Sequence, residues 1–261
     1  MRESPLRGLS VWVTRPEPEN ERSAAFWRAA GADVAVVPFL VVVQEKVPAD
    51  EIDLLEADPP DHVVFTSARA VEKLLVVLHD RPHLAAQLKT LPTWTVGEKT
   101  LEAAREAGFL DLRRNPGQTA QDLAEHMTRN LTDRETVLFP AAKQRRPELP
   151  RVMAAAKIPL IEWTVYDSVR VSLSVPEHRA RLHGASPPLL LLYSPTAARA
   201  AARIVGTGLA QEVPVATLGD STRATAEEWN LRVVASAHLA SEESLLESLS
   251  AWWSEQLRGE A

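Results

Sequence analysis

Short apolar runs alternate with longer amphipathic segments along most of the chain. In the first half, runs with the length of strands lie near residues 11–14, 34–37, 63–66, 94–97 and 111–114. In the second half, the continuous run Leu189–Leu192 is typical of a strand that is buried on both faces. Because helical segments separate the strands, the pattern predicts an α/β protein with parallel, doubly wound sheets flanked by helices.

The pattern occurs twice. Residues 95–100 (TVGEKT) and 217–222 (TLGDST), which lie 122 residues apart, both read as a strand end, a glycine and the start of a helix. Other segments match at the same or a similar spacing. Residues 11–130 and 137–258 are therefore interpreted as two copies of one unit, which indicates two similar domains.

Two extended, β-rich segments interrupt this alternation at equivalent points of the two copies. They are residues 39–44 (FLVVVQ) and 162–168 (EWTVYDS). Both are candidates for connectors between domains, and two such segments can pair as a two-stranded ladder. The chain would then cross between the domains twice, with one domain inserted into the other.

Composition narrows the class of protein. The chain has 261 residues, 45% of them hydrophobic and 25% charged, which suits two folded domains with apolar cores. Its formal net charge of −6 argues against general nucleic-acid binding. The absence of cysteine excludes disulfides, cysteine-bound metals and thiol nucleophiles. No apolar run approaches the roughly 18–20 residues that cross a bilayer, and no signal core is visible, so a cytoplasmic location is expected.

The common catalytic signatures are missing from the sequence. There is neither a Gly-x-Ser-x-Gly elbow nor a phosphate-binding Gly-x-x-x-x-Gly-Lys-Ser/Thr loop. His79 and His83 are four residues apart, but Pro82 interrupts the helix that would bring them together. Neither a metal site nor a cofactor is expected.

Hydroxyl side chains recur where a predicted strand ends and a helix begins. Ligands of open parallel sheets bind at this edge, where free N–H groups of helix N-termini favour anions. For any one of these residues the ordinary helix cap is the favoured interpretation, and Thr66 or Ser67, Thr100, Thr119, Thr222 and Ser241 are predicted caps. The candidate binding hydroxyls are Thr14, Thr66, Ser67, Thr100, Ser194, Thr196, Ser221 and Thr222.

Basic residues accompany these hydroxyls. Each alone is typical of a solvated surface charge, but together with helix N-termini they favour an anionic ligand such as a carboxylate. They are Arg15, Arg69, Lys99, Lys143, Arg145, Arg146, Arg199 and Arg223. Tyr166, one of two tyrosines, lies in the second connector, either lining a cleft between the domains or packed within the connector.

The whole chain resembles the uroporphyrinogen-III synthase family of tetrapyrrole biosynthesis. The resemblance lies in the order and spacing of short stretches along nearly the full length. They are residues 11–16 (VWVTRP), 31–34 (GADV) with Pro38, 64–67 (VFTS), 96–100 (VGEKT), 138–140 (LFP), 164–166 (TVY) and 218–222 (LGDST).

This resemblance implies two α/β domains joined by a two-stranded β connector. Domain 1 would be discontinuous, residues 1–38 with 170–261, and domain 2 would be residues 44–162. The connectors would be residues 39–43 and 163–169. The implied activity is that of a lyase that cyclises linear hydroxymethylbilane to uroporphyrinogen III, with loss of water and inversion of ring D, without a cofactor.

The resemblance also implies roles for residues. Tyr166 would assist departure of the hydroxyl group as the catalytic residue. The acetate and propionate carboxylates of the substrate would be held by Thr14, Arg15, Thr66, Ser67, Lys99, Thr100, Lys143, Ser194, Thr196, Ser221 and Thr222. The expected protein is a monomer that binds neither nucleic acid nor membrane.

This sequence departs from the family pattern near the expected cleft, at Arg69, at residues 141–143 and at residues 194–196. An alternative function fits the same fold. A non-catalytic two-domain module that closes on an anionic small molecule would also place its ligand between hinged domains.

Overall fold

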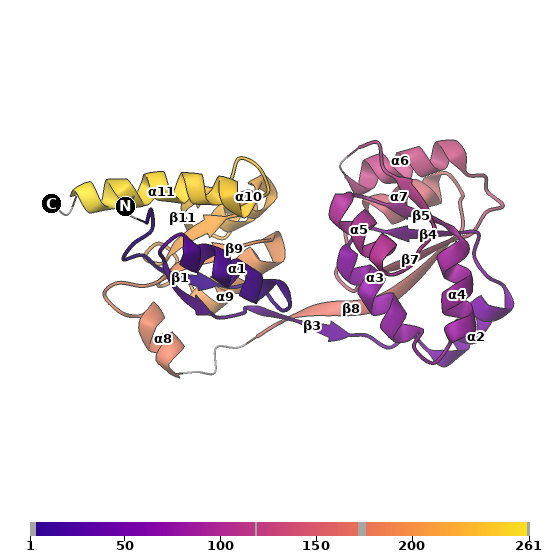
Figure 1. Ribbon diagram of the computed structural model, residues 1–261, viewed down its shortest axis with the longest axis horizontal. Coiled ribbons are helices and arrows are strands. Elements are labelled where there is room, and N and C mark those ends of the chain that lie inside the picture. The colour runs from indigo at the N-terminus through magenta and orange to yellow at the C-terminus, as the bar shows by residue number, and fades with distance from the viewer. Residues whose placement is uncertain (1–3, 118, 172–175, 260–261) are drawn as a thin grey trace. The chain divides into compact units, whose positions relative to one another are not determined.

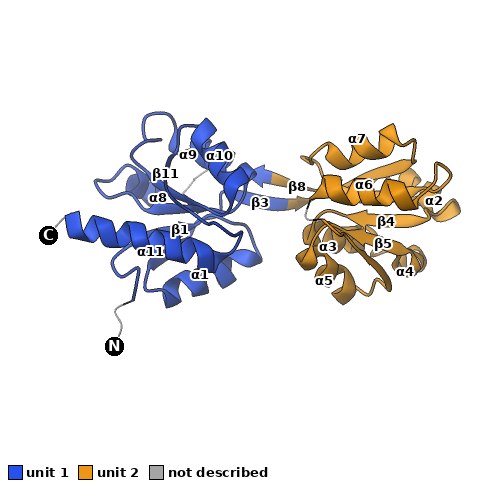
Figure 2. Cartoon of the chain, turned by 90° about the horizontal axis from the view of Figure 1, so that it is seen from above, with its two compact units in different colours: residues 1–42, 169–261 blue, residues 43–168 orange. Residues whose placement is uncertain are grey.

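The computed structural model describes residues 4–117, 119–171 and 176–259. The chain divides into two compact units, coloured separately in Figure 2. Unit 1 comprises residues 1–42 and 169–261, and unit 2 comprises residues 43–168. Each unit is an α/β sandwich built around its own sheet.

The sheet of unit 1 has the strand order β11-β10-β9-β1-β2. All its paired strands run parallel. The strands are β1 (Ser10–Val13), β2 (Asp33–Val36), β9 (Leu189–Leu192), β10 (Pro214–Thr217) and β11 (Arg232–Ser236).

Helices cover both faces of this sheet. Trp12 points into a core shared with α9 and α10, whereas Val11 and Val13 point into a core shared with α1 and α11. Burial on both faces explains why the central strand β9 is apolar at every position. The helices are α1 (Glu19–Ala29), α8 (Pro176–Leu182), α9 (Pro195–Val205), α10 (Asp220–Glu228) and α11 (Glu242–Gly259).

The sheet of unit 2 has the order β3-β8-β7-β4-β5-β6. From β8 to β6 the pairs are parallel. The strands are β3 (Leu40–Gln44), β4 (His62–Phe65), β5 (Pro92–Thr95), β6 (Asp111–Arg114), β7 (Val137–Ala142) and β8 (Leu160–Arg170).

The predicted ladder of connectors is confirmed, because β3 and β8 are adjacent strands (Figure 1). They run in opposite directions. The N–H of Val171 donates to the Phe39 carbonyl at 3.0 Å, and the N–H of Glu45 donates to the Val165 carbonyl at 3.1 Å. The unit boundary falls within both strands.

The sheet of unit 2 is also covered on both faces, with α6 and α7 on one side and α3 and α5 on the other (Figure 2). Val64, Leu123, Met127 and Phe139 belong to the core beneath α6 and α7. The helices are α2 (Ala49–Ala57), α3 (Ala68–Val77), α4 (Pro82–Thr90), α5 (Glu98–Glu106), α6 (Ala120–Asn130) and α7 (Glu148–Ala155).

The two sheets share one strand order, which supports the duplication. Strands β6-β5-β4-β7-β8 of unit 2 match β11-β10-β9-β1-β2 of unit 1. Unit 1 combines β1 and β2 of the first sequence copy with β9–β11 of the second. Unit 2 combines β4–β6 of the first copy with β7 and β8 of the second. Each unit is therefore assembled from halves of both copies.

Three of the predicted helix caps are confirmed. The hydroxyls of Ser67 and Ser241 accept the N–H groups of Ala70 and Ser244, both at 3.2 Å. Thr119 caps α6 in a reciprocal capping box with Asp122.

The predictions that Thr100 and Thr222 are N-caps are wrong. Gly97 and Gly219 hold those positions, and each threonine lies one turn inside its helix. Gly219 has a φ of 89°, which favours glycine over threonine. Glu98 and Asp220 then occupy the first turn, where a carboxylate complements the helix dipole.

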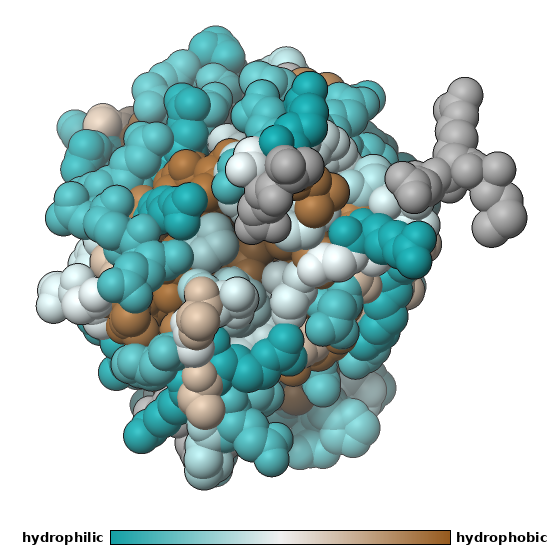
Figure 3. Space-filling view, turned by 90° about the vertical axis from the view of Figure 1, so that its left-hand side faces the viewer, coloured by the Kyte–Doolittle hydropathy of each residue, from teal (hydrophilic) through white to brown (hydrophobic). Residues whose placement is uncertain are grey.

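Polar side chains dominate the face of the molecule seen in Figure 3, with apolar residues showing between them. Among the helices in the described part of the chain, none is long and apolar enough to span a membrane.

A buried histidine of unit 2 is paired with a glutamate. Nε2 of His62 lies 3.0 Å from Oε1 of Glu135, whose other oxygen accepts the N–H of Thr132 at 2.8 Å. The hydrogen bond with His62, followed by those with Thr132, lowers the pKa of Glu135 from 4.5 to about 2.

We expect Glu135→Gln to destabilise the protein at pH 6, with the loss shrinking as the pH falls from 4.5 towards 2. A lowered pKa means that the carboxylate stabilises the folded state above the unfolded pKa, and that this contribution disappears as the folded pKa is approached. Urea unfolding of both proteins across this range measures the difference. Glu106→Gln, which changes an exposed glutamate of α5, is the control. A pH-independent loss would contradict the prediction.

Candidate functional site

A cavity of about 360 Å³ lies at the carboxyl ends of the strands of unit 2. Val96, Phe139 and Leu149 form its apolar wall. Its principal polar and charged lining residues are Thr66, Ser67, Thr119, Arg145, Arg146 and Tyr166. They come from the residues that follow β4, the interior of β8, the N-cap of α6 and the loop between β7 and α7. The cavity thus combines hydroxyl groups and cations with an apolar wall.

Tyr166 and Ser67 are joined by a hydrogen bond at the centre of this polar wall. Oη of Tyr166 lies 3.1 Å from Oγ of Ser67. Ser67 Oγ also accepts the N–H of Ala70, which belongs to the first turn of α3. Tyr166 is 8% exposed. The phenol is therefore linked through one hydroxyl to the N-terminus of a helix.

Arg145 is held in place beside the cavity. Its Nε donates to Glu162 at 2.8 Å, and one terminal nitrogen donates to the Ala142 carbonyl and to the Thr164 hydroxyl, both at 3.1 Å. Its side chain is 26% exposed. These bonds fix the guanidinium, and the exposed Arg146 adds a second cation to the rim.

The electrostatics of the cavity favour an anionic ligand. The N-termini of α3 and α6 both begin at its lining, directly after Ser67 and Thr119. Helix N-termini carry positive partial charge and N–H donors. Together with Arg145 and Arg146 they suit carboxylate groups, while the apolar wall suits the rest of an organic molecule.

Three other candidate residues of unit 2 lie outside the lining of this cavity. Lys143 Nζ lies 3.3 Å from Glu45 and 4.0 Å from Asp167. Lys99 is exposed on α5, and Thr100 is buried there. The sequence had indicated Arg145 and Arg146 as basic residues close to the candidate hydroxyls. It did not indicate the apolar residues that form the wall of the cavity.

The candidate residues of unit 1 lie at the carboxyl edge of its own sheet. Thr14 is fully buried, and its hydroxyl donates to the Leu191 carbonyl at 2.5 Å. Ser194 caps α9, and Thr196 accepts a hydrogen bond from Arg199 at 3.4 Å. Ser221 is exposed.

Thr222 is buried, and its hydroxyl donates to the Leu218 carbonyl at 3.2 Å. Like the hydroxyl of Thr14, this hydroxyl therefore donates its proton to a backbone carbonyl of the same unit.

Tyr193 of unit 1 holds the chain position that corresponds to Thr66 of unit 2. Tyr193 follows β9 and precedes the cap Ser194, as Thr66 follows β4 and precedes the cap Ser67. Trp27 Nε1 donates to Tyr193 Oη at 3.0 Å, and Arg15 stacks 4.4 Å from the ring centre. Burial, and then the Glu242 carboxylate, raises the pKa of Tyr193 above its ordinary value.

The chain is similar over nearly its whole length to one group of proteins. A family model described as uroporphyrinogen-III synthase HemD matches residues 21–247. A uroporphyrinogen-III synthase of Synechococcus elongatus is 27% identical over 272 residues, which cover 97% of this chain and 98% of the relative.

Solved structures of similar proteins have the same fold. A uroporphyrinogen-III synthetase from Helicobacter pylori has a TM-score of 0.66 at 19% identity, covering 94% of this chain and 99% of its own. A mutant uroporphyrinogen III synthase from Thermus thermophilus has a TM-score of 0.65 at 16% identity, covering 94% and 98%.

We expect Thr14→Val to lower the free energy of unfolding by about 1–2 kcal/mol, because the Leu191 carbonyl would lose a buried donor. Urea denaturation measures this loss. Thr196→Val is the matched control, and it should change stability by less than about 0.5 kcal/mol because its hydroxyl is only half-buried. Equal stability of Thr14→Val and the unmodified protein would contradict a structural role for this hydroxyl.

Proposed function

Because the chain belongs to the uroporphyrinogen-III synthase family, we propose that it cyclises linear hydroxymethylbilane to uroporphyrinogen III, with loss of water and inversion of ring D. The observation that carries the proposal beyond family membership is the hydrogen-bonded pair of Tyr166 and Ser67 at the wall of an anion-favouring cavity. The reaction needs a proton donor for the departing hydroxyl and groups that hold the carboxylates of the substrate. A phenol beside carboxylate-binding groups supplies both.

The substrate supplies most of the reactivity. The pyrrole nitrogen donates electrons towards the hydroxymethyl carbon, so the C–O bond breaks once the oxygen is protonated and water leaves. Without an enzyme, the resulting cation closes the ring at the free carbon and gives the uninverted isomer. The protein must direct attack to the substituted carbon of ring D through a spiro intermediate, which is mainly a matter of positioning.

Tyr166 is the proposed proton donor to the departing hydroxyl. As its O–H proton passes to that oxygen, the phenolate left behind accepts a hydrogen bond from Ser67 across 3.1 Å. The Ala70 N–H in the first turn of α3 orients Ser67 and polarises it further. The helix N-terminus and Arg145 favour the negative phenolate, so the proton transfer is supported electrostatically.

The carboxylates of the substrate are the proposed partners of the cations and helix ends. Arg145 offers a guanidinium already fixed by Glu162, and the hydroxyls of Thr66 and Thr119 add donors. The apolar wall faces the pyrrole rings. The remaining binding candidates are kept as predictions: Thr14, Arg15, Lys99, Thr100, Lys143, Ser194, Thr196, Ser221 and Thr222.

The isomer ratio of the product tests the function. We expect the protein, incubated with freshly generated hydroxymethylbilane and then oxidised, to yield mainly type III uroporphyrin, whereas a protein-free control yields type I. Chromatographic separation of the isomers gives the ratio. Type I product alone would reject the synthase function and favour a non-catalytic module that binds an anionic molecule.

We expect Tyr166→Phe to lower kcat about 100-fold with little change in KM, because the phenol acts only as the C–O bond breaks. Steady-state kinetics of type III formation measures both constants. Tyr193→Phe is the matched control, since it removes the hydroxyl of the other tyrosine, in unit 1, and should leave kcat within about twofold. Full activity of Tyr166→Phe would remove the tyrosine from the mechanism.

A further inference from the structure

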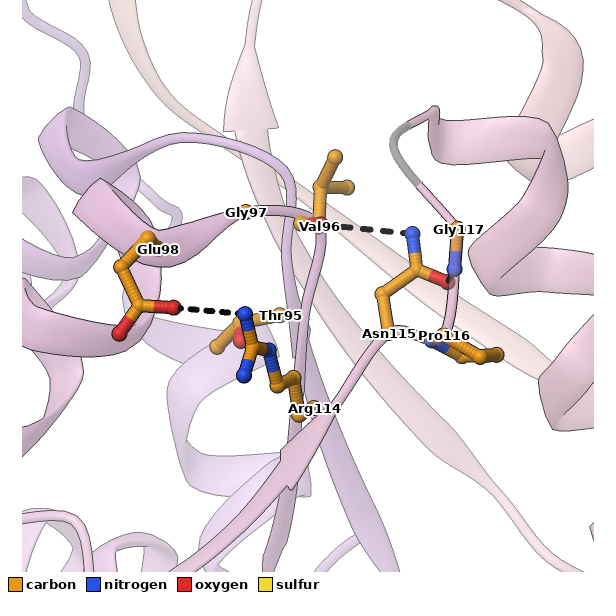
Figure 4. A pocket seen from close by; sticks show the side chains of 8 residues that line it. All are labelled: Thr95, Val96, Gly97, Glu98, Arg114, Asn115, Pro116 and Gly117. Carbon is orange, nitrogen blue, oxygen red and sulfur yellow. Dashed lines mark hydrogen bonds and ion pairs between the residues drawn. The ribbon is translucent and has the colours of Figure 1, made fainter.

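A second cavity, of about 530 Å³, lies beyond the first at the ends of β5 and β6 (Figure 4). Its lining includes Thr95, Gly97, Glu98, Arg114 and Asn115. Val96 lines both cavities, so the two are neighbours along one edge of the sheet of unit 2.

Thr95, which lines this cavity, has a hydroxyl that makes no hydrogen bond with the described residues. The residue is 1% exposed, and its Oγ1 has no hydrogen-bond partner among the described residues. A buried hydroxyl without a partner costs free energy and is uncommon in folded proteins. Thr95 is the register partner of Arg114 on β6, so their side chains are neighbours on the same face of the sheet. Thr95 and Arg114 therefore line the cavity from adjacent strands.

The N-terminus of α5 adds donors of the same kind. Gly97 is the N-cap and contributes no side-chain cap to the first turn. Apart from its chain neighbours, no described residue places a heavy atom within 4 Å of the position that a Cβ would occupy on Gly97. A ligand can therefore approach the positive end of this helix closely.

The charges at the rim can exchange partners. Arg114 lies 3.2 Å from the Glu98 carboxylate, with the two side chains 77% and 64% exposed. Exposed ion pairs of this kind contribute little stability. A carboxylate of a ligand can thus replace Glu98 on Arg114 at small cost, while Glu98 competes for the same cation.

Asn115 makes the wall between the two cavities rigid. Its amide group donates to the Val96 carbonyl at 3.3 Å and to the Thr119 carbonyl at 3.1 Å, and its oxygen accepts the N–H of Gly117 at 3.1 Å. Figure 4 shows this amide on one side of Val96 and the Arg114–Glu98 pair on the other. Val96 and Thr119 also line the first cavity, so Asn115 of the second cavity is hydrogen-bonded to residues of the first.

We infer that this second cavity is an anion subsite for a carboxylate arm of the same linear tetrapyrrole, with Thr95, Arg114 and the first turn of α5 as donors. The inference rests on the proposed function. Glu98 acts as an internal competitor that occupies Arg114 until the substrate arrives. The substrate then spans both cavities across Val96.

Charge variants at the rim test the subsite. In steady-state kinetics of type III formation, we expect Arg114→Gln to raise KM about three- to tenfold with kcat retained, because it removes a binding contact remote from the reacting carbon. Glu98→Gln should lower KM, because it removes both the competitor and a like charge. Arg113→Gln is the matched control: Arg113 is the neighbouring exposed arginine of β6, pairs with Asp111 at 2.8 Å and lies outside the lining.

Thr95→Val separates binding from structure. Removing a buried hydroxyl without a partner should raise the Tm of the ligand-free protein, yet it should raise KM because the substrate loses a donor. A hydroxyl with a structural role only would not produce these opposite changes. A wild-type KM in Thr95→Val and Arg114→Gln would overturn the subsite, and so would a KM in Arg113→Gln that rises as much as in Arg114→Gln. Type III formation by the unmodified protein would still support the proposed function in either case. Type I product alone from the unmodified protein would overturn both.

Discussion

Parallel pairing forces each crossover helix of unit 2 to begin at the same edge of the sheet. Along β8-β7-β4-β5-β6, the loop after every strand emerges beside its neighbours, so α3, α5 and α6 present their N-termini to one surface. Positive helix ends that would otherwise be scattered are thereby concentrated. Both cavities, the Tyr166–Ser67 pair and the two arginines on the loop after β7 depend on this shared edge.

The two units show how one pattern can give two chemistries. After β4 the chain places Thr66, a small residue, and the space above it is the first cavity. After β9 it places Tyr193 at the corresponding position, and the ring packs against Trp27 and Arg15. Corresponding positions of the two units thus carry a small hydroxyl residue that lines a cavity in unit 2 and an aromatic ring packed against neighbours in unit 1.

Local hydrogen bonding explains which features were predictable from the sequence. Strand positions followed from runs of apolar residues, and Ser67 and Ser241 could be recognised as caps because a cap bonds to an amide only three residues away. The predictions for Thr100 and Thr222 were wrong because each helix begins three residues earlier, after Gly97 and Gly219. Only Gly219 has a positive φ that favours glycine.

Tertiary pairing explains what the sequence could not reveal. Lys143 and Arg145 are two residues apart in one loop and equally basic. Lys143 points to Glu45 and Asp167, whereas Arg145 is fixed beside the cavity by Glu162 on β8. The partners lie far away in sequence, and they decide which cation faces the site. The neutral wall formed by Val96 likewise depends on the alignment of β5 with β4.

A net charge of −6 is compatible with an anionic substrate because electrostatic interactions in salt solution act over short distances. Charges farther away than about 8–10 Å are largely screened, so the donors that line the edge decide binding. Those donors differ in mobility. Arg145 is 26% exposed and has three acceptors, whereas Arg114 is 77% exposed and shares one weak pair. A rigid cation beside the reacting end and an exchangeable cation farther along suit a flexible substrate, because the first fixes the geometry of ring closure while the second adapts to the remaining chain.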